Sequence, residues 1–127
     1  GLDGVLTVEG FDPALAEGVM LLTPFSADAE DEATKSFVAK FQEKTGIIPN
    51  QFAADAYDVI YAIYQACVAG NVTADMSAAE INAILVEQFT SMTFDGLTGA
   101  GMTWAATGEV SKSPMAVVIK DGVYVGA

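Results

Sequence analysis

The side chains available for chemistry in this sequence are almost all carboxylates. Its 127 residues include 17 Asp and Glu, five Lys and Arg, one Cys and no His. The densest acidic group contains Asp28, Glu30, Asp31 and Glu32, and paired carboxylates of this kind can carry out general acid–base catalysis. A short run of charges, however, is more typical of a solvated helix start.

Motifs of common enzyme sites do not occur in the sequence. There is no His to act as a general base and no Gly-x-Ser-x-Gly elbow. Gly96, Gly99 and Gly101 form a turn cluster without the strand, helix and lysine of a phosphate-binding loop. We therefore predict that the chain is not an enzyme and needs no cofactor.

Cys67 is the only thiol, so a disulfide within the chain is excluded. The absence of His also argues against a His/Cys metal site. Because Cys67 lies on an apolar helical face, we interpret it as a small buried hydrophobic residue.

Charge and hydropathy exclude further classes of function. The formal charge of −12 argues against nucleic-acid binding, which requires clustered Lys or Arg. Although 52% of the residues are hydrophobic, no apolar run is long enough to cross a membrane. No signal peptide is visible at Gly1, so we expect either a mature chain or an excised piece.

The elements that must position any site are organised around one apolar helix, predicted from Phe52 to Ala69. Apolar residues recur at three- and four-residue steps, at positions 53, 56, 57, 60, 63, 64 and 67. Further apolar residues widen this face, so we predict a central helix packed on more than one side. Gly70 fits a left-handed C-terminal cap.

Two more helices and several strands surround it. Asp12 and Pro13 predict a brief helical turn, residues 19–25 a buried strand, and residues 33–45 a helix that ends at Gly46. The spacing of Ser77 and Glu80 is that of a capping box, which predicts a third helix. After Thr93 the sequence predicts short strands and turns, including a C-terminal hairpin around residues 120–122.

Three stretches together resemble a known family. Residues 37–46, then Pro49, then residues 56–58 (Ala-Tyr-Asp) are similar to the periplasmic-binding-protein type I family. Within it, the resemblance is strongest to branched-chain amino-acid (Leu/Ile/Val-type) solute-binding proteins of ABC importers. Residues 17–25 resemble the strand of that family that crosses between its two lobes.

The resemblance covers nearly the whole chain, but family members have well over twice its length. It implies an α/β fold in which helices pack on a small sheet, with a C-terminal β-hairpin. Residues 1–127 would then be a single partial domain, the C-terminal portion of a two-lobed protein. Because apolar surfaces would be left uncovered, we predict a homodimer or a domain-swapped assembly.

The resemblance also implies three ligand-binding candidates. Phe52 matches the position of an aromatic wall residue, although it could equally be ordinary core. Asp55 is either a ligand contact or a cap at the helix start. Asp3 is a candidate for the acid that meets the ligand's ammonium group, the alternatives being a residue upstream of Gly1 or a solvated terminal Asp. Tyr57 and Asp58 resemble a family pair with a mainly structural role.

The partners implied by the resemblance are a small amino acid and an ABC permease in the membrane. The location would be extracytoplasmic, in the periplasm or at the cell surface with a lipid anchor. The family's carboxylate-binding hydroxyls lie outside this chain, so we expect the isolated chain to bind amino acids weakly or not at all. Two other possibilities stay open: a self-associating fragment without ligand activity, and part of a ligand-sensing domain of a signalling receptor.

Overall fold

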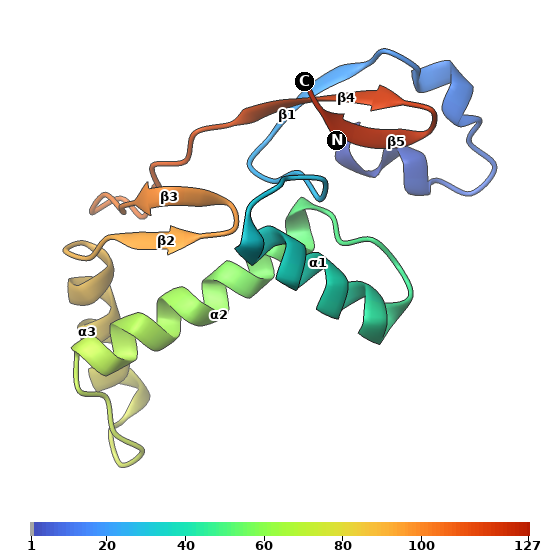
Figure 1. Ribbon diagram of the computed structural model, residues 1–127. Helices are drawn as coiled ribbons and strands as arrows, with labels where there is room; N and C mark the ends of the chain where they lie inside the picture. Colours follow the sequence, from blue (N-terminus) through green and yellow to red (C-terminus); the bar gives the residue numbers. More distant parts are fainter. Residues whose placement is uncertain (1) are drawn as a thin grey trace. The chain divides into compact units, whose positions relative to one another are not determined.

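The computed structural model describes residues 2–127, with side chains described for residues 4–6 and 8–127 (Figure 1). The chain divides into two compact units. The first contains the residues up to Ala54 together with Ser113–Ala127, and the second contains Asp55–Lys112.

The first unit is built on a three-stranded antiparallel sheet. It contains the 3-10 helices η1 (Leu2–Thr7) and η2 (Pro13–Ala16), helix α1 (Glu32–Thr45), and strands β1 (Met20–Thr23), β4 (Met115–Lys120) and β5 (Val123–Gly126). The strand order is β1-β4-β5, with β4 in the middle. The turn between β4 and β5 places Asp121 and Gly122 at positive φ, which confirms the predicted hairpin and its turn residues.

The two faces of this sheet differ in burial. Val117 and Ile119 are buried on one face, whereas Met20 and Leu22 of β1 are 61% and 67% exposed on the other. The prediction that residues 19–25 form a strand is confirmed for residues 20–23, but the expectation that this strand is buried is wrong. As a strand at the edge of an antiparallel sheet, β1 needs cover on one face only.

Helix α1 begins and ends where the sequence predicts. The Asp31 carboxylate accepts a hydrogen bond from the Thr34 N–H at 2.9 Å, and this bond lowers the pKa of Asp31. Gly46 adopts a left-handed φ of 77° at the C-terminal end. Phe37 is buried against Phe25, with ring centroids 5.9 Å apart in an edge-to-face arrangement.

The second unit is helical with a small hairpin. Most of helix α2 (Gln51–Ala69) belongs to it, with α3 (Ala78–Phe89), β2 (Phe94–Gly96) and β3 (Gly99–Met102). Ala62, Phe94 and Met102 form its core, and Phe89, Met92 and Trp104 pack against them. The predicted capping box at α3 is confirmed, because Ser77 and Glu80 exchange side-chain to backbone hydrogen bonds.

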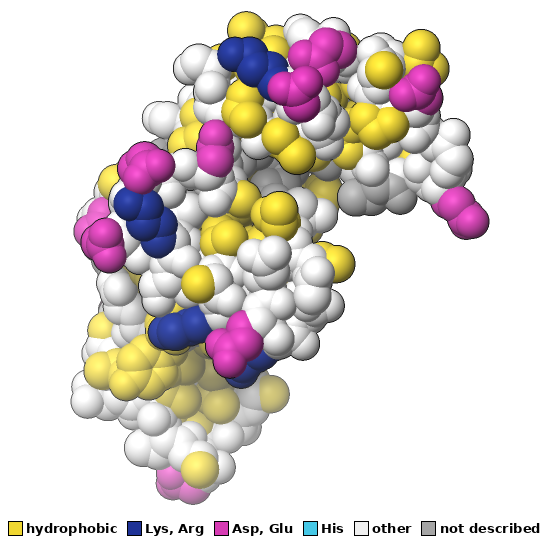
Figure 2. Space-filling view, turned by 45° about the vertical axis from the view of Figure 1, so that its right-hand side comes forward, with side chains coloured by type: hydrophobic (Ala, Val, Ile, Leu, Met, Phe, Trp, Pro, Cys, Tyr) yellow, Lys and Arg dark blue, Asp and Glu magenta, His cyan; other side chains and the backbone are white. Residues whose placement is uncertain are grey.

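Helix α2 differs from the prediction in how it packs. Only a narrow stripe is buried, and it consists of Ala54, Asp58, Ala62 and Ala66. The apolar residues that we expected to be covered include Ile60 and Tyr64, which are 66% and 65% exposed. The prediction of packing on more than one side is therefore wrong within this chain, since one narrow stripe contacts the rest of its unit. Figure 2 shows hydrophobic side chains reaching the surface at several places, between scattered acidic ones.

Gly70 also has a different role from the predicted one. The residue with positive φ after α2 is Asn71, at 52°, rather than Gly70. A Cβ atom at Gly70 would lie 2.1 Å from Cγ2 of Ile84 on α3. Gly70 is therefore needed because α3 packs closely against it.

Candidate functional site

The start of α2 is fixed by polar contacts from the residues that precede it. The Asn50 side chain accepts a hydrogen bond from the Ala53 N–H at 3.2 Å, which caps the helix. The buried Thr23 hydroxyl of β1 donates to Oε1 of Gln51 at 2.7 Å. The bond between Thr23 and Gln51 anchors the first turn of α2 to the sheet of the first unit.

Phe52 lies in this anchored first turn, and its side chain is 59% exposed. The alternative interpretation, that Phe52 is an ordinary core residue, is therefore wrong within this chain. A large aromatic side chain in solvent on a fixed helix turn is the kind of surface that lines an apolar binding site.

Asp55 lies in the second unit and forms an ion pair. Its Oδ1 atom is 2.5 Å from Nζ of Lys112, and the two side chains are 34% and 27% exposed. Lys112 is the only basic residue between positions 55 and 112 of the sequence. The alternative that Asp55 caps the helix is wrong, because Asn50 occupies that position and Asp55 lies a full turn further on.

Asp3 lies in η1, but its side chain is outside the part of the structure that is described. Phe52 and Asp55 belong to different units.

Asp58, by contrast, has a clear structural role. Its buried carboxylate accepts hydrogen bonds from the Leu97 N–H at 2.9 Å, and from the Thr98 N–H and hydroxyl at 2.8 and 2.7 Å. The predicted structural role is confirmed, and its backbone partners lie 39 and 40 residues further along the chain. These contacts hold the loop between β2 and β3 against α2.

Tyr57, the other member of the family pair, packs at the surface of the unit. Its ring is 40% exposed and lies against Tyr61, with centroids 4.6 Å apart. A hydrogen bond with Tyr61 raises the pKa of the Tyr57 phenol above its ordinary value of 10.0, and the partial burial of the ring raises this pKa further. The phenol is therefore neutral at physiological pH.

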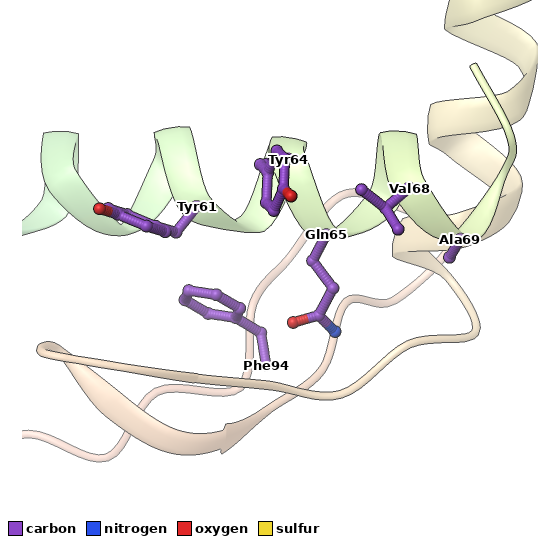
Figure 3. A pocket seen from close by; sticks show the side chains of 6 residues that line it. All are labelled: Tyr61, Tyr64, Gln65, Val68, Ala69 and Phe94. Carbon is purple, nitrogen blue, oxygen red and sulfur yellow. The ribbon is translucent and has the colours of Figure 1, made fainter. Parts of the chain in front are cut away.

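A groove of about 380 Å³ lies beside the C-terminal half of α2. Figure 3 shows Tyr61, Tyr64 and Val68 along the helix, with Phe94 of β2 reaching toward it from the opposite side. Gln65 and Ala69 complete the lining, and the Gln65 amide donates a hydrogen bond to the Thr93 carbonyl at 2.9 Å. The groove can hold an apolar or aromatic group, but it has no charged side chain to bind the ends of an amino acid.

Sequence reasoning missed this groove for an identifiable reason. Tyr61, Tyr64 and Val68 follow helical spacing, which we interpreted as the signature of a buried face. The periodicity identifies an apolar face, but it does not tell whether this chain covers that face. The groove is distinct from the predicted site at the start of α2.

Among the residues that the structure describes, no group of three or more His, Cys, Asp or Glu side chains could hold a metal ion. Over the same part of the chain, no helix is both long and apolar enough to cross a membrane.

Comparison with known proteins identifies the fold. The family model described as periplasmic binding protein matches residues 5–122. No curated protein sequence is significantly similar to the chain.

Three solved structures illustrate the structural similarity. A putative branched-chain amino acid ABC transporter from Rhodospirillum rubrum is 24% identical, with a TM-score of 0.64 over 93% of this chain and 35% of that one. A leucine binding protein from Thermotoga maritima is 22% identical, with a TM-score of 0.68 over 88% and 30%. A solute binding protein of an ABC transporter from R. palustris, in complex with benzoate, is 18% identical, with a TM-score of 0.72 over 98% and 32%. The chain thus spans about a third of the length of these proteins, and it has a partial α/β fold of their type.

Proposed function

This chain belongs to the periplasmic binding protein family, and we propose that it is the C-terminal portion of a two-lobed solute-binding protein. That protein captures a branched-chain or similar amino acid outside the cytoplasm and delivers it to an ABC permease. The observation that carries the proposal is the family match over residues 5–122. The printed descriptions of two similar structures, a branched-chain amino acid transporter and a leucine binding protein, support this substrate class.

The whole gene provides the first test of this proposal. We expect roughly 200 further residues upstream of Gly1, beginning with a signal sequence that directs export to the periplasm or to a lipid anchor. Titration calorimetry of the complete protein should show binding of leucine, isoleucine or valine. A complete protein that binds neither these three amino acids nor any similar one would contradict the proposed substrate class.

The isolated chain should bind the same amino acids weakly or not at all. It spans about a third of the similar structures, and the groups that hold the ligand's carboxylate belong in our proposal to the remainder. Calorimetry of the 127-residue chain should therefore show no binding of leucine in the micromolar range. Micromolar binding to the isolated chain would refute the assignment of these groups to the missing part.

Phe52 is the residue that we assign to the apolar wall of the binding site. Its exposure on an anchored helix turn supports this role. In the complete protein, Phe52→Ala should weaken leucine binding about tenfold, because apolar contact area is lost. Val86→Ala is the matched control, since it removes another exposed apolar side chain from a different helix. Equal effects of both substitutions would argue against the assignment.

Asp55 and Asp3 remain candidates for polar ligand contacts. If Asp55 binds the ammonium group of a ligand, this ammonium group must share the Asp55 carboxylate with Lys112. Asp55→Asn should then lower affinity more than Lys112→Gln, which removes the ion-pair partner but leaves the carboxylate. The acid that meets the ammonium is otherwise Asp3 or a residue upstream of Gly1.

Two alternative functions would be favoured by different observations. The exposed apolar residues of α2 and β1 favour a self-associating fragment without ligand activity. A ligand-sensing domain of a signalling receptor uses the same fold, and a transmembrane segment encoded after Ala127 would favour that reading.

A further inference from the structure

Phe52 is exposed, but the chain on either side of it is buried. Its side chain is 59% exposed, whereas Pro49 before it and Ala54 after it are buried. The Ala54 N–H donates to the Asn50 carbonyl at 3.3 Å, which closes the first turn of α2 around Phe52. All of these residues belong to the first unit. The place of the Phe52 ring therefore depends on what holds this short segment.

A side chain from β1 holds that segment. The Thr23 hydroxyl is buried, and it donates to Oε1 of Gln51 at 2.7 Å. The same oxygen accepts a hydrogen bond from the Phe25 N–H at 3.3 Å and lies 3.1 Å from the Phe25 carbonyl oxygen. A hydroxyl has one hydrogen and two lone pairs, so it can donate over the shorter distance to Gln51 and still accept from Phe25. Thr23 thus contacts both the turn that leaves β1 and the residue that precedes Phe52.

The turn that leaves β1 is itself held in place. Phe25 is 5% exposed, and its ring packs edge-to-face on Phe37 of α1. Because Thr23 is bonded to the Phe25 backbone, its hydroxyl is a fixed donor and α2 must align with it. Gln51 and Phe52 are adjacent in the chain, so a restraint on the first acts directly on the second.

We propose that Thr23 and Gln51 are positioning residues for Phe52. Their hydrogen bond fixes the first turn of α2, so the aromatic ring is in place before a ligand arrives. This inference rests on the proposed function, in which Phe52 belongs to the apolar wall of an amino-acid site. A wall that is held in advance raises affinity, because binding energy is not used to order it.

Titration calorimetry of the complete protein with leucine tests the proposal. Thr23→Val keeps the shape of the side chain and removes the hydroxyl, and it should weaken leucine binding about three- to tenfold. The upper limit is the loss expected for Phe52→Ala, because Thr23 acts through that ring. Thr23→Ser retains the hydroxyl and should restore most of the affinity. Gln51→Met removes the acceptor from a half-buried position and should resemble Thr23→Val, so it decides the question if that variant does not fold.

A double-mutant cycle separates positioning from a general loss of stability. In a Phe52→Ala background, Thr23→Val should change leucine affinity by less than ~twofold, because the ring through which it acts is gone. Thr34→Val is the matched control. Thr34 is also a buried threonine of the first unit, but its side chain bonds to Asp31 at the start of α1. This substitution should lower thermal stability and leave leucine affinity unchanged.

The order of the Phe52 backbone can be measured without any ligand. NMR relaxation of the 127-residue chain should give the Phe52 amide an order parameter of about 0.85 in the wild type and in Thr23→Ser. In Thr23→Val and Gln51→Met the value should fall toward the ~0.6 of flexible backbone. Thr34→Val should retain the wild-type value.

The outcomes distinguish this inference from the proposed function. Unchanged leucine affinity in Thr23→Val and Gln51→Met, or an equal loss with and without the Phe52 ring, would overturn the positioning role. An unchanged order parameter at Phe52 would overturn it as well, since other contacts would then fix the turn. If the complete wild-type protein binds no amino acid, the proposed function fails, and the order parameter still decides whether the Thr23–Gln51 bond holds Phe52.

Discussion

The carboxylate of Asp58 joins α2 to the loop that follows β2 through three hydrogen bonds, two from backbone N–H groups and one from the Thr98 hydroxyl. Both Asp58 and Thr98 are almost completely buried. A buried carboxylate is stable only when its oxygens are paired in this way. Gly96 passes so close to Asp58 that any side chain there would displace the carboxylate.

Gly96→Ala tests this contact. A Cβ atom at position 96 would lie 2.5 Å from Oδ2 of Asp58, and the two hydrogen bonds from Thr98 hold that oxygen in place. We expect the free energy of unfolding to fall by about 2 kcal/mol, measured by urea denaturation. Gly126→Ala is the control, because no atom lies within 4 Å of a Cβ there. It should change stability by less than ~0.5 kcal/mol, and equal losses would show that the close approach is not the cause.

Asp28 provides a pH-dependent contact in the first unit. The Asp28 carboxylate accepts hydrogen bonds from the Ser26 hydroxyl and from the Gly126 N–H, the latter at 3.0 Å. Both bonds lower the pKa of Asp28 below the ordinary value of 3.8, and the bond from Ser26 has the larger effect. A group with a lowered folded-state pKa contributes stability above its unfolded pKa and loses it as pH falls through the folded pKa.

The stabilising contribution of Asp28 should therefore be complete above about pH 5 and decline below pH 4. Urea denaturation at a series of pH values should show a shallower acid decline in Asp28→Asn than in the wild type. Asp55→Asn, which leaves this contact intact, should retain the decline that Asp28 causes. Parallel pH profiles for Asp28→Asn and the wild type would show that Asp28 does not contribute.

Among the secondary-structure elements, α3 depends most clearly on its first residues. Ser77 accepts the Glu80 N–H at 3.3 Å, and Glu80 accepts the Ser77 N–H at 2.9 Å and lies beside the Ser77 hydroxyl at 2.6 Å. Hydrogen bonds from Ser77 lower the pKa of Glu80, which keeps it ionised to perform this role. These bonds satisfy N–H groups that a helix start otherwise leaves unpaired.

Ser77→Ala should lower the free energy of unfolding by about 1 kcal/mol, as the loss of an N-cap usually does. Thermal and urea denaturation followed by circular dichroism would measure the change. Ser91→Ala, just beyond the end of α3, removes a hydroxyl that bonds only to helix carbonyls. It should have a much smaller effect, and a larger loss than for Ser77→Ala would contradict the capping account.

At the scale of the whole molecule, the dominant feature is apolar surface that the chain does not cover itself. The exposed apolar residues of α2 and the open face of β1 belong to the two different units. Large exposed apolar patches on a soluble chain are typical of surfaces that contact another polypeptide. The chain spans about a third of the length of its structural relatives, and in our proposal the rest of a two-lobed protein covers these surfaces.

Self-association should couple to stability by mass action. If the folded chain dimerises and the unfolded chain does not, the melting temperature rises with protein concentration. Calorimetric scans across a hundredfold range of concentration should show this rise in the wild type. A wild-type melting temperature independent of concentration would argue against folding-coupled dimerisation.

The sequence alone determined the local features of this protein. The capping box at Ser77, the end of α1 at Gly46, and the Asp-Gly turn of the C-terminal hairpin depend on interactions between residues close in the chain. Those interactions follow from backbone geometry and side-chain type, so spacing is sufficient to predict them. The family resemblance rests on the same kind of short-range pattern.

Only the tertiary structure decided which surfaces are covered. The buried stripe of α2 consists of Ala54, Asp58, Ala62 and Ala66, and within it Ala62 packs against Phe94 and Met102 of the β2–β3 hairpin. The larger apolar residues lie on the other side, although both sets have helical spacing. The partners of Asp58 and the neighbour of Gly70 are far away in sequence. Burial depends on what another part of the polypeptide brings to a face, and the periodicity of one helix contains no information about that.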